Sequence, residues 1–350
     1  MRAISHQLAA SNPGPHAPPA DRLELVEELV RRLEARFGPG IIYRLSRARP
    51  KLGAVALSTG SLGLDRASGV GGVPRGRLSV LQGGDSSGKT TLAYHLLAEA
   101  QCDGGLAALI DGEGASDPLA MRACGVDLDD LILASPRDAA EALEMVEILV
   151  RCRALDAVVA SALPPARPGL LALGLRKLNA WLKDAPTAVV FVDGGWGLRV
   201  RGWRLIPDPD PPSPNPLAFF ASLIVELRQL RPVYGPGGDL LGLRVRAVVV
   251  KNRLAPPGGL AEFEVLNGRG LRKAAEALEL ALALGLVERR FQGLVWSSEN
   301  VFLGRSHAAA QAELESDPEL AAAIAAAVRG WGMGAGVGEQ ENGKDENLIP

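Results

Sequence analysis

A glycine-rich loop at residues 83–91 has the residue types that bind phosphate. It consists of Gly83, Gly84, Asp85, Ser86, Ser87, Gly88, Lys89, Thr90 and Thr91, and it follows the apolar run at 78–81. Small residues let the backbone wrap around a phosphate chain, so several N–H groups and the positive end of the next helix point at it. The spacing predicts that Lys89 contacts the β- and γ-phosphates and that Thr90 holds Mg²⁺. The alternative is an ordinary strand-to-helix turn with an unrelated lysine.

Acidic residues after this loop are candidates for the catalytic part of the site. Glu113 follows the apolar run at 106–110, where a carboxylate can face a bound γ-phosphate and orient a water molecule. The alternative for Glu113 is a solvated loop carboxylate. A second acid is expected at the end of another strand to hold the Mg²⁺ shell, but the run at 157–159 continues into Ala160 and Ser161. Asp111 could partly take that role.

Composition limits the class of protein. The chain has 350 residues, of which 22% are charged, and a formal net charge of −2, so any binding of nucleic acid must use a local basic patch. The three cysteines have neither the pairing of a disulfide framework nor the spacing of a zinc site. No apolar run is long and uncharged enough to cross a membrane, and nothing resembles a signal peptide. We therefore expect a soluble cytoplasmic protein without a membrane partner.

Apolar strands alternate with amphipathic helices on both sides of the phosphate loop. This pattern predicts an α/β fold with a mostly parallel sheet buried on both faces. Three strand-like runs at 217–227, 243–251 and 261–266 have no helices between them, so they predict an antiparallel extension. An amphipathic helix is expected to begin at Asp21 and to end at Gly38. An Ala- and Leu-rich stretch after Gly270 predicts a small α+β domain.

Five blocks in the sequence resemble, in the same order, the blocks of the bacterial RecA recombinase family. They are Ser58-Thr59-Gly60-Ser61-Leu62-Gly63-Leu64-Asp65, the loop at 83–92, Ile110-Asp111-Gly112-Glu113-Gly114-Ala115-Ser116-Asp117-Pro118, the stretch at 248–257, and the stretch at 261–270. The resemblance implies a RecA-type ATPase core at 51–270. It also implies an N-terminal oligomerisation helix region at 21–50 and a C-terminal domain at 271–332. The proline-rich composition of residues 1–20 and the polar, acidic composition of residues 333–350 predict disordered ends.

The resemblance also implies roles for single residues. Lys89 and Thr90 match contacts to ATP and Mg²⁺, Glu113 matches the glutamate that activates water, and Asp117 matches an acid near the adenine. Lys251 and Arg253 match a basic pair that reaches the ATP of the neighbouring subunit in a filament, with Arg in the second position in place of Lys. An arginine keeps the charge and adds a planar fork. A solvated strand end is the alternative for this pair.

The sequence departs from the family pattern at positions that, in the family, link ATP binding and hydrolysis to DNA binding. Ala160 stands at the magnesium-shell aspartate, Ala120 at an aromatic ring that stacks on the base, and Gly194 at a glutamine that senses the γ-phosphate. The second DNA-binding loop is rewritten and contains Trp196, Arg199, Arg201, Trp203 and Arg204. Arginines interleaved with tryptophans could bind single-stranded DNA by charge and by stacking. Alternatively, the rings pack against the domain and the arginines are ordinary surface charge.

Two functions therefore stay open. The first is an ATP- and single-stranded-DNA-binding protein that self-associates into a filament or ring and acts in homologous recombination and DNA repair, with weakened hydrolysis. The second is a non-catalytic paralogue that assists or regulates an intact recombinase or a translesion polymerase. A phosphate-loop kinase is disfavoured, since no lid or acceptor site is evident.

Overall fold

The computed structural model describes residues 19–38, 56–161, 163, 167–183, 185–193, 198–201, 204–207, 216–235 and 237–331. The chain divides into two compact units, Met1–Gly53 and Ala54–Pro350, and each is described by itself. Disordered ends were predicted at 1–20 and 333–350; residues 1–18 and 333–350 lie outside the described residues, whereas residues 19 and 20 are helical. Among the helices that are described, none has the length and apolar character needed to cross a bilayer.

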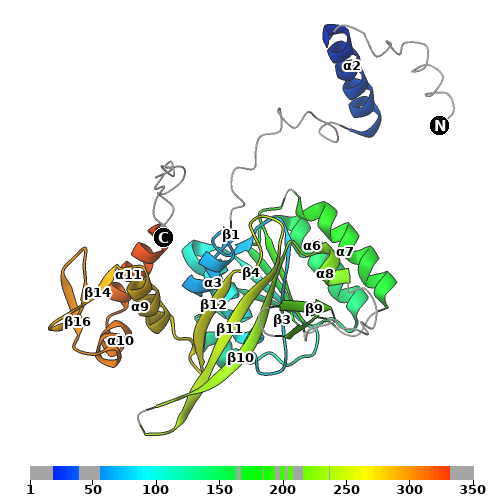
Figure 1. Cartoon of the computed structure of the whole chain (residues 1–350). Helices are drawn as coiled ribbons and strands as arrows, with labels where there is room; N and C mark the ends of the chain where they lie inside the picture. Colours follow the sequence, from blue (N-terminus) through cyan, green and yellow to red (C-terminus); the bar gives the residue numbers. More distant parts are fainter. Residues whose placement is uncertain are drawn as a thin grey trace, which may run out of the picture. The chain divides into compact units, whose positions relative to one another are not determined.

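The first unit contains the amphipathic helix α2, Pro19–Phe37 (Figure 1). The helix begins two residues before the predicted start at Asp21, because a proline is tolerated in the first turn of a helix. It ends at Gly38 as predicted. Gly38 has a φ of 103° and donates its N–H to the carbonyl of Glu34 at 2.8 Å.

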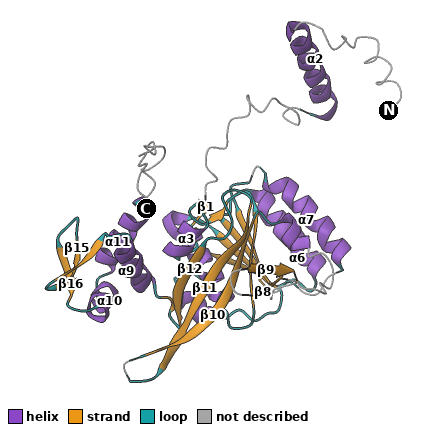
Figure 2. Cartoon of the chain, viewed as in Figure 1, coloured by secondary structure: helices purple, strands orange, loops and turns teal. Residues whose placement is uncertain are grey.

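The second unit is built on a nine-stranded sheet in the order β13-β12-β11-β10-β3-β7-β6-β4-β5 (Figures 1 and 2). The strands are β3 (Leu78–Gly83), β4 (Ala107–Asp111), β5 (Leu131–Ala134), β6 (Ala157–Ser161), β7 (Ala188–Asp193), β10 (Leu223–Tyr234), β11 (Leu240–Asn252), β12 (Leu260–Leu266) and β13 (Gly270–Leu271). Pairing is parallel from β10 through β3, β7, β6 and β4 to β5, and antiparallel from β10 to β13. The predicted α/β class with an antiparallel extension is confirmed.

One predicted strand was wrong. Residues 217–227 do not form a single strand, because α8 (Pro216–Phe220) comes first and β10 begins only at Leu223. Pro216 is the first residue of α8, a position where proline's missing N–H is not needed. A short apolar run can be helix or strand, and periodicity alone does not separate the two.

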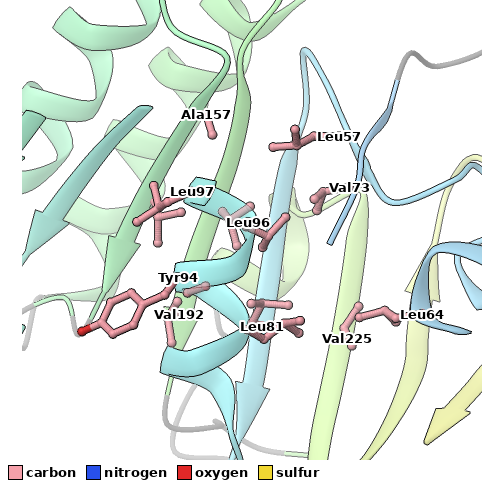
Figure 3. Close-up of a cluster of buried hydrophobic side chains, with 14 of the residues drawn as sticks. Leu57, Leu64, Val73, Leu81, Tyr94, Leu96, Leu97, Ala157, Val192 and Val225 are labelled. Carbon is pink, nitrogen blue, oxygen red and sulfur yellow. The ribbon is translucent and has the colours of Figure 1, made fainter. Parts of the chain in front are cut away.

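Each face of the sheet is covered by its own helices. Helix α4 (Lys89–Gln101) packs on one face, where Leu81, Val159 and Val192 belong to the same buried cluster as Leu96 and Leu97 of the helix (Figure 3). Helices α6 (Ala139–Cys152) and α7 (Pro168–Leu182) cover the other face (Figure 2). Successive strand residues alternate between the two faces, so membership of a cluster tells which way a strand residue points.

The elements after Gly270 pack around a third cluster. They are α9 (Lys273–Ala283), β14 (Val287–Arg290), β15 (Gly293–Trp296), β16 (Val301–Gly304), α10 (His307–Ser316) and α11 (Pro318–Gly330). Glu276 of α9 joins them to the core, because its buried carboxylate accepts hydrogen bonds from Ser61 Oγ and from the N–H groups of Leu62 and Gly63. The last two donors lie in α3 (Leu62–Ala67). Burial raises the pKa of Glu276 to about 7 in spite of these donors.

Candidate nucleotide site

The phosphate loop leaves the sheet at the carboxyl end of β3 and enters α4. Gly83 must be glycine, because a Cβ there would lie 2.4 Å from the carbonyl oxygen of Leu227 on β10 and 2.7 Å from Ser87 Oγ. Gly88 caps α4 in the left-handed conformation, with a φ of 87°. The first N–H to bond within the helix is that of Leu92, to the carbonyl of Gly88 at 2.9 Å. The N–H groups of Lys89, Thr90 and Thr91 therefore stay available at the positive end of α4.

Lys89 lies across this loop. Its ammonium donates to the carbonyl oxygens of Gly83 at 2.8 Å and Gly84 at 2.6 Å. Burial lowers the pKa of Lys89, and the negative charges of Asp85 and Asp193 oppose that shift. A triphosphate would offer the ammonium much stronger acceptors than two neutral carbonyls.

Asp111 organises the loop that carries Glu113. Its Oδ1 accepts from the N–H groups of Glu113, Gly114 and Ala115, and its Oδ2 accepts from that of Ser116 at 2.9 Å. Burial alone would raise the pKa of Asp111, but these bonds outweigh it and keep the pKa below its ordinary value. Both oxygens are thus engaged within the protein. The idea that Asp111 replaces the missing magnesium acid is disfavoured, and Asp111 instead positions Glu113.

Glu113 and Asp117 lie on the exposed side of this loop. Glu113 is exposed to solvent, which fits a group that orients water next to a bound nucleotide and equally fits a solvated loop carboxylate. Asp117 caps the N-terminus of α5 (Pro118–Ala123) by accepting the N–H of Leu119 at 2.8 Å. Ala120, at the position where the family pattern has an aromatic ring, packs partly buried against the cluster around α4. The structure thus gives Asp117 a capping role.

Ala160, which matches the family's magnesium-shell aspartate in the sequence comparison above, does not face the phosphate loop. Strand pairing aligns Leu81, Val192, Ser161 and Asp111 in one row across β3, β7, β6 and β4, on the face that α4 covers. Ala160 belongs to the opposite face and is fully buried with Ile110 and Phe191. The end residue of β6 that faces the phosphate loop is therefore Ser161, so a hydroxyl and not a methyl group stands there.

Lys251 and Arg253 gather around the end of α8. Lys251 Nζ donates to the carbonyl oxygens of Ala218 at 2.6 Å and Phe219 at 3.2 Å, and Arg253 donates to Phe219 at 2.8 Å. Burial and the charge of Arg253 both lower the pKa of Lys251. The structure brings these two residues together but does not bring them to the phosphate loop of the same chain.

The rewritten loop contains a short antiparallel hairpin. Strand β8 (Leu198–Arg201) pairs with β9 (Arg204–Pro207), and the register puts Arg201 opposite Arg204 and Arg199 opposite Ile206. Paired and alternate residues share a face of a hairpin, so the three arginine positions fall on one face. Trp203 and Trp196 lie outside the described residues.

The residues present fit a magnesium nucleotide. The loop offers free helical N–H groups, an ammonium, and the buried hydroxyl of Ser87, which has no hydrogen-bond partner among the described residues. Thr90 is exposed at the first turn of α4, where its hydroxyl can reach a cation on the phosphates. No group of three or more His, Cys, Asp or Glu side chains in the described part of the chain could hold a metal by itself. This suits Mg²⁺, which usually takes few protein ligands and shares the substrate's phosphate oxygens.

Asp193 is an acidic residue that the sequence analysis did not single out, and its charge acts on Lys89. It ends β7 in the same way that Asp111 ends β4, directly after an apolar run, and it lies next to Gln82 of β3. The signal was present in the sequence as a strand that ends in an acid.

The chain is similar in sequence to proteins of one family. The RecA N-terminal domain family matches residues 24–272. The protein named RecA from Heliobacterium modesticaldum is 36% identical over 320 residues, which cover 86% of this chain and 91% of that protein. RecA from Thermus thermophilus is 36% identical over 313 residues, covering 84% and 90%. A crystal structure of the RadB recombinase superposes with a TM-score of 0.48 at 24% identity and covers 61% of this chain and 98% of that one.

The sequence matches extend through the phosphate loop, the Glu113 loop and the β10–β12 region, in the same order as the elements that build the site. By these matches the chain belongs to the RecA family.

Proposed function

We propose that this protein binds ATP with Mg²⁺ in the phosphate loop, binds single-stranded DNA, self-associates, and acts in homologous recombination and DNA repair. The observation that carries the proposal is the phosphate loop of a RecA-family chain, in which Gly83 has no room for a side chain, Gly88 caps α4 in the left-handed conformation, and Lys89 and Thr90 lie in the first turn of α4. Lys89 would hold the β- and γ-phosphates, and Thr90 the cation.

The β8–β9 hairpin is the proposed DNA contact. By the pairing register its positions Arg199, Arg201 and Arg204 share one face of the hairpin, and these are the residues proposed to contact DNA phosphates. Phosphate contacts of this kind depend strongly on salt, and Trp203 could add base stacking. The short proline-containing segment 162–167 comes directly after β6 and this hairpin comes soon after β7, so both begin at the carboxyl edge of the sheet, where the nucleotide would lie.

Co-sedimentation with single-stranded DNA tests the proposal. With ATP and Mg²⁺ present, the protein should pellet with the DNA, and Lys89→Ala should abolish this nucleotide-dependent fraction. Arg201→Ala combined with Arg204→Ala should weaken DNA binding but leave nucleotide binding intact. The proposal would be contradicted if the wild-type protein bound no adenine nucleotide, or if it did not bind single-stranded DNA in the presence of ATP.

Hydrolysis is proposed to be slow and only weakly stimulated by DNA. With Ser161 in place of an acid on the α4 face, the transition state loses stabilisation on the order of 3 kcal/mol, which is roughly a hundredfold in rate. Single-turnover hydrolysis measured with and without DNA tests this. A hydrolysis rate equal to that of a RecA protein that has an acid at the end of this strand would contradict the prediction of slow hydrolysis.

A second candidate is an accessory paralogue that uses ATP as a structural ligand and caps or regulates the filament of an intact recombinase, or assists a translesion polymerase. Ser161 and Gly194 favour it, because both stand where the family couples ATP to DNA. A strand-exchange assay separates the two candidates. Autonomous strand exchange supports the first, whereas activity only in mixtures with an intact recombinase supports the second.

A further inference from the structure

The loop that carries Glu113 uses all of its backbone donors within the protein. Each N–H group from residue 112 to residue 117 donates to an acceptor of the chain. Those of residues 113–116 go to the carboxylate of Asp111, and that of Gly112 goes to the carbonyl of Ser161. The N–H of Asp117 goes to the hydroxyl oxygen of Tyr94 at 3.3 Å. A surface loop can leave such donors to water, so their full use here indicates a loop held in one conformation.

Tyr94 differs from the other acceptors because it belongs to α4. Asp111 and Ser161 end the neighbouring strands β4 and β6, whereas Tyr94 lies in the helix that starts with Lys89. Its ring packs in the buried cluster around α4, and its hydroxyl points away from the labelled leucines (Figure 3). The hydrogen bond from Asp117 therefore joins the loop to the helix whose first turn would hold the phosphates.

The Ser116 side chain connects Tyr94 to the Asp111 carboxylate. Burial raises the pKa of Tyr94, and the hydrogen bonds with the Asp117 N–H and with the Ser116 side chain oppose that shift. Burial also acts to raise the pKa of Asp111, and the Ser116 side chain is foremost among the hydrogen-bond partners that keep this pKa below its ordinary value. A carboxylate is a stronger acceptor than a phenol, so the serine hydroxyl donates to Asp111 and the phenol donates to the serine oxygen.

The position of Glu113 depends on these anchors. A glutamate that orients water is effective only when its distance from the reacting phosphate is held. The side chain of Glu113 is exposed, so its place is set by the backbone that carries it. Asp111 fixes this backbone to β4, and Tyr94 with Ser116 fixes it to α4. The two anchors together set the distance between Glu113 and the first turn of α4.

We propose that Tyr94 and Ser116 are positioning residues for ATP hydrolysis, which act by tying the loop of Glu113 to the helix that follows the phosphate loop. This inference rests on the proposed function. Neither side chain contacts the nucleotide in this assignment. Removal of either hydroxyl therefore lowers the rate of hydrolysis and leaves nucleotide affinity unchanged.

Hydrogen exchange of the nucleotide-free protein tests the tie itself. In Tyr94→Phe the ring still fills its place in the cluster, but the N–H of Asp117 loses its acceptor. Amide exchange in residues 113–119 should become roughly three- to tenfold faster, which is what the loss of one hydrogen bond allows. The thermal unfolding midpoint should stay close to that of the wild type. Exchange at the wild-type rate overturns the proposal.

Single-turnover ATP hydrolysis and calorimetry of ATP binding with Mg²⁺ test the role. In Tyr94→Phe and in Ser116→Ala the rate should fall roughly tenfold, since a displacement of about 1 Å can cost up to about a hundredfold. The Kd should stay at the wild-type value. The double variant should be no slower than the slower single variant, because both hydroxyls belong to one chain of hydrogen bonds. An unchanged rate, or a Kd that weakens in step with the rate, overturns the proposal.

The Glu113→Gln background shows whether Tyr94 acts through Glu113. The rate in that background is already low, and the addition of Tyr94→Phe should lower it no further. A further fall would mean that the tyrosine acts on another group, and this refutes the positioning role.

Gln101→Ala is the matched control. Gln101 ties the other end of α4 to the chain after α5, through hydrogen bonds with the backbone of Asp127 at 2.8 and 2.9 Å. Its loss should speed exchange around Asp127 but leave both the exchange at 113–119 and the hydrolysis rate unchanged. If Gln101→Ala slowed hydrolysis as much as Tyr94→Phe, the cause would be a general loosening of α4, and the assignment to Tyr94 would be overturned.

The outcomes for the wild-type protein separate the two proposals. If it binds no nucleotide, the proposed function is refuted and this inference falls with it. If it binds and hydrolyses ATP, and Tyr94→Phe does so at the same rate, only this inference is refuted. Binding of ATP without any hydrolysis also refutes only this inference, because Tyr94 would then have no reaction to serve.

Discussion

At the scale of the residue, the alternation of side chains along β6 decides whether Ala160 or Ser161 faces α4 and the phosphate loop. Ala160 is fully buried among apolar side chains that include Ile110 and Phe191, whereas Ser161 is partly exposed at the strand end on the face of α4. Ala160→Asp should destabilise the fold by about 3 kcal/mol or more, because it buries a carboxyl group without a partner. Ser161→Asp should change stability by less than about 1 kcal/mol, as expected for a partly exposed site.

Urea denaturation of the two variants measures this difference directly. Equal destabilisation would show that the two positions do not face different environments. The same comparison explains what the sequence could predict here. The phosphate loop is a local motif, so Lys89 and Thr90 were identified from spacing alone. Ala160 and Ser161 are neighbours, and only the pairing of β6 with β4 and β7 shows which of them points to α4.

At the scale of the element, the join between α9 and α3 responds to pH. Burial raises the pKa of Glu276 from 4.5 to about 7, so the folded state holds the proton more tightly than the unfolded chain. The stability that this provides is full below pH 4.5 and is lost as the pH rises through 7, with a loss on the order of 3 kcal/mol. Burial likewise raises the pKa of Asp65 to about 6, so Asp65 adds to the slope in the same window.

Glu276→Gln should therefore flatten the fall in the free energy of unfolding between pH 5 and pH 8 without removing it. Denaturant midpoints at several pH values supply the measurement. A variant whose midpoints fall as steeply as those of the wild type would show that Glu276 does not titrate in this range.

A second join uses ion pairs between β11, β12 and α9. Arg244 is 16% exposed and pairs with Glu262 at 3.1 Å and Glu279 at 2.9 Å, whereas Arg246 is 46% exposed and pairs with the same Glu262 at 2.7 Å. Arg244→Ala should cost about 2–4 kcal/mol, because it leaves carboxylates without their partner in a partly buried site. Arg246→Ala, the matched control, should cost less than about 1 kcal/mol. Thermal and urea unfolding would contradict this if the two variants were equally stable.

Elements differ in how far sequence determines them. The parallel core was predictable because apolar runs and amphipathic helices alternate with clear boundaries. The run at 217–227 was not, because its first apolar residues form α8 and only tertiary context separates them from β10. The hairpin of β10 and β11 is longer than the predicted strands. Polar residues such as Arg228 and Arg231 still pair with β11 after the pairing of β10 with β3 has ended at Leu227.

At the scale of the whole molecule, the register of the sheet separates Lys251 from the phosphate loop of its own chain. Lys251 pairs with Ile224, and Ile224 pairs with Val80, three residues before Gly83 and so about 10 Å along the strand. Lys251 is also two strands away from β3, and its ammonium is directed at carbonyl oxygens of α8. A contact between Lys251 or Arg253 and ATP is therefore expected to use the nucleotide of another copy.

Mixing two defective proteins tests this shared site. The Lys89→Ala variant cannot bind the phosphates with its own phosphate loop but keeps the basic pair Lys251 and Arg253. The double variant Lys251→Ala with Arg253→Ala keeps an intact phosphate loop but lacks the basic pair. Each variant alone should show no ATP-dependent binding to single-stranded DNA. The mixture should recover a fraction of the wild-type binding, because at some contacts between copies an intact phosphate loop lies next to an intact basic pair. The matched control replaces Lys89→Ala with the triple variant that carries all three changes, and that mixture should stay inactive. If the first mixture is as inactive as the control, the basic pair does not act across copies, and the two residues serve only to cap α8.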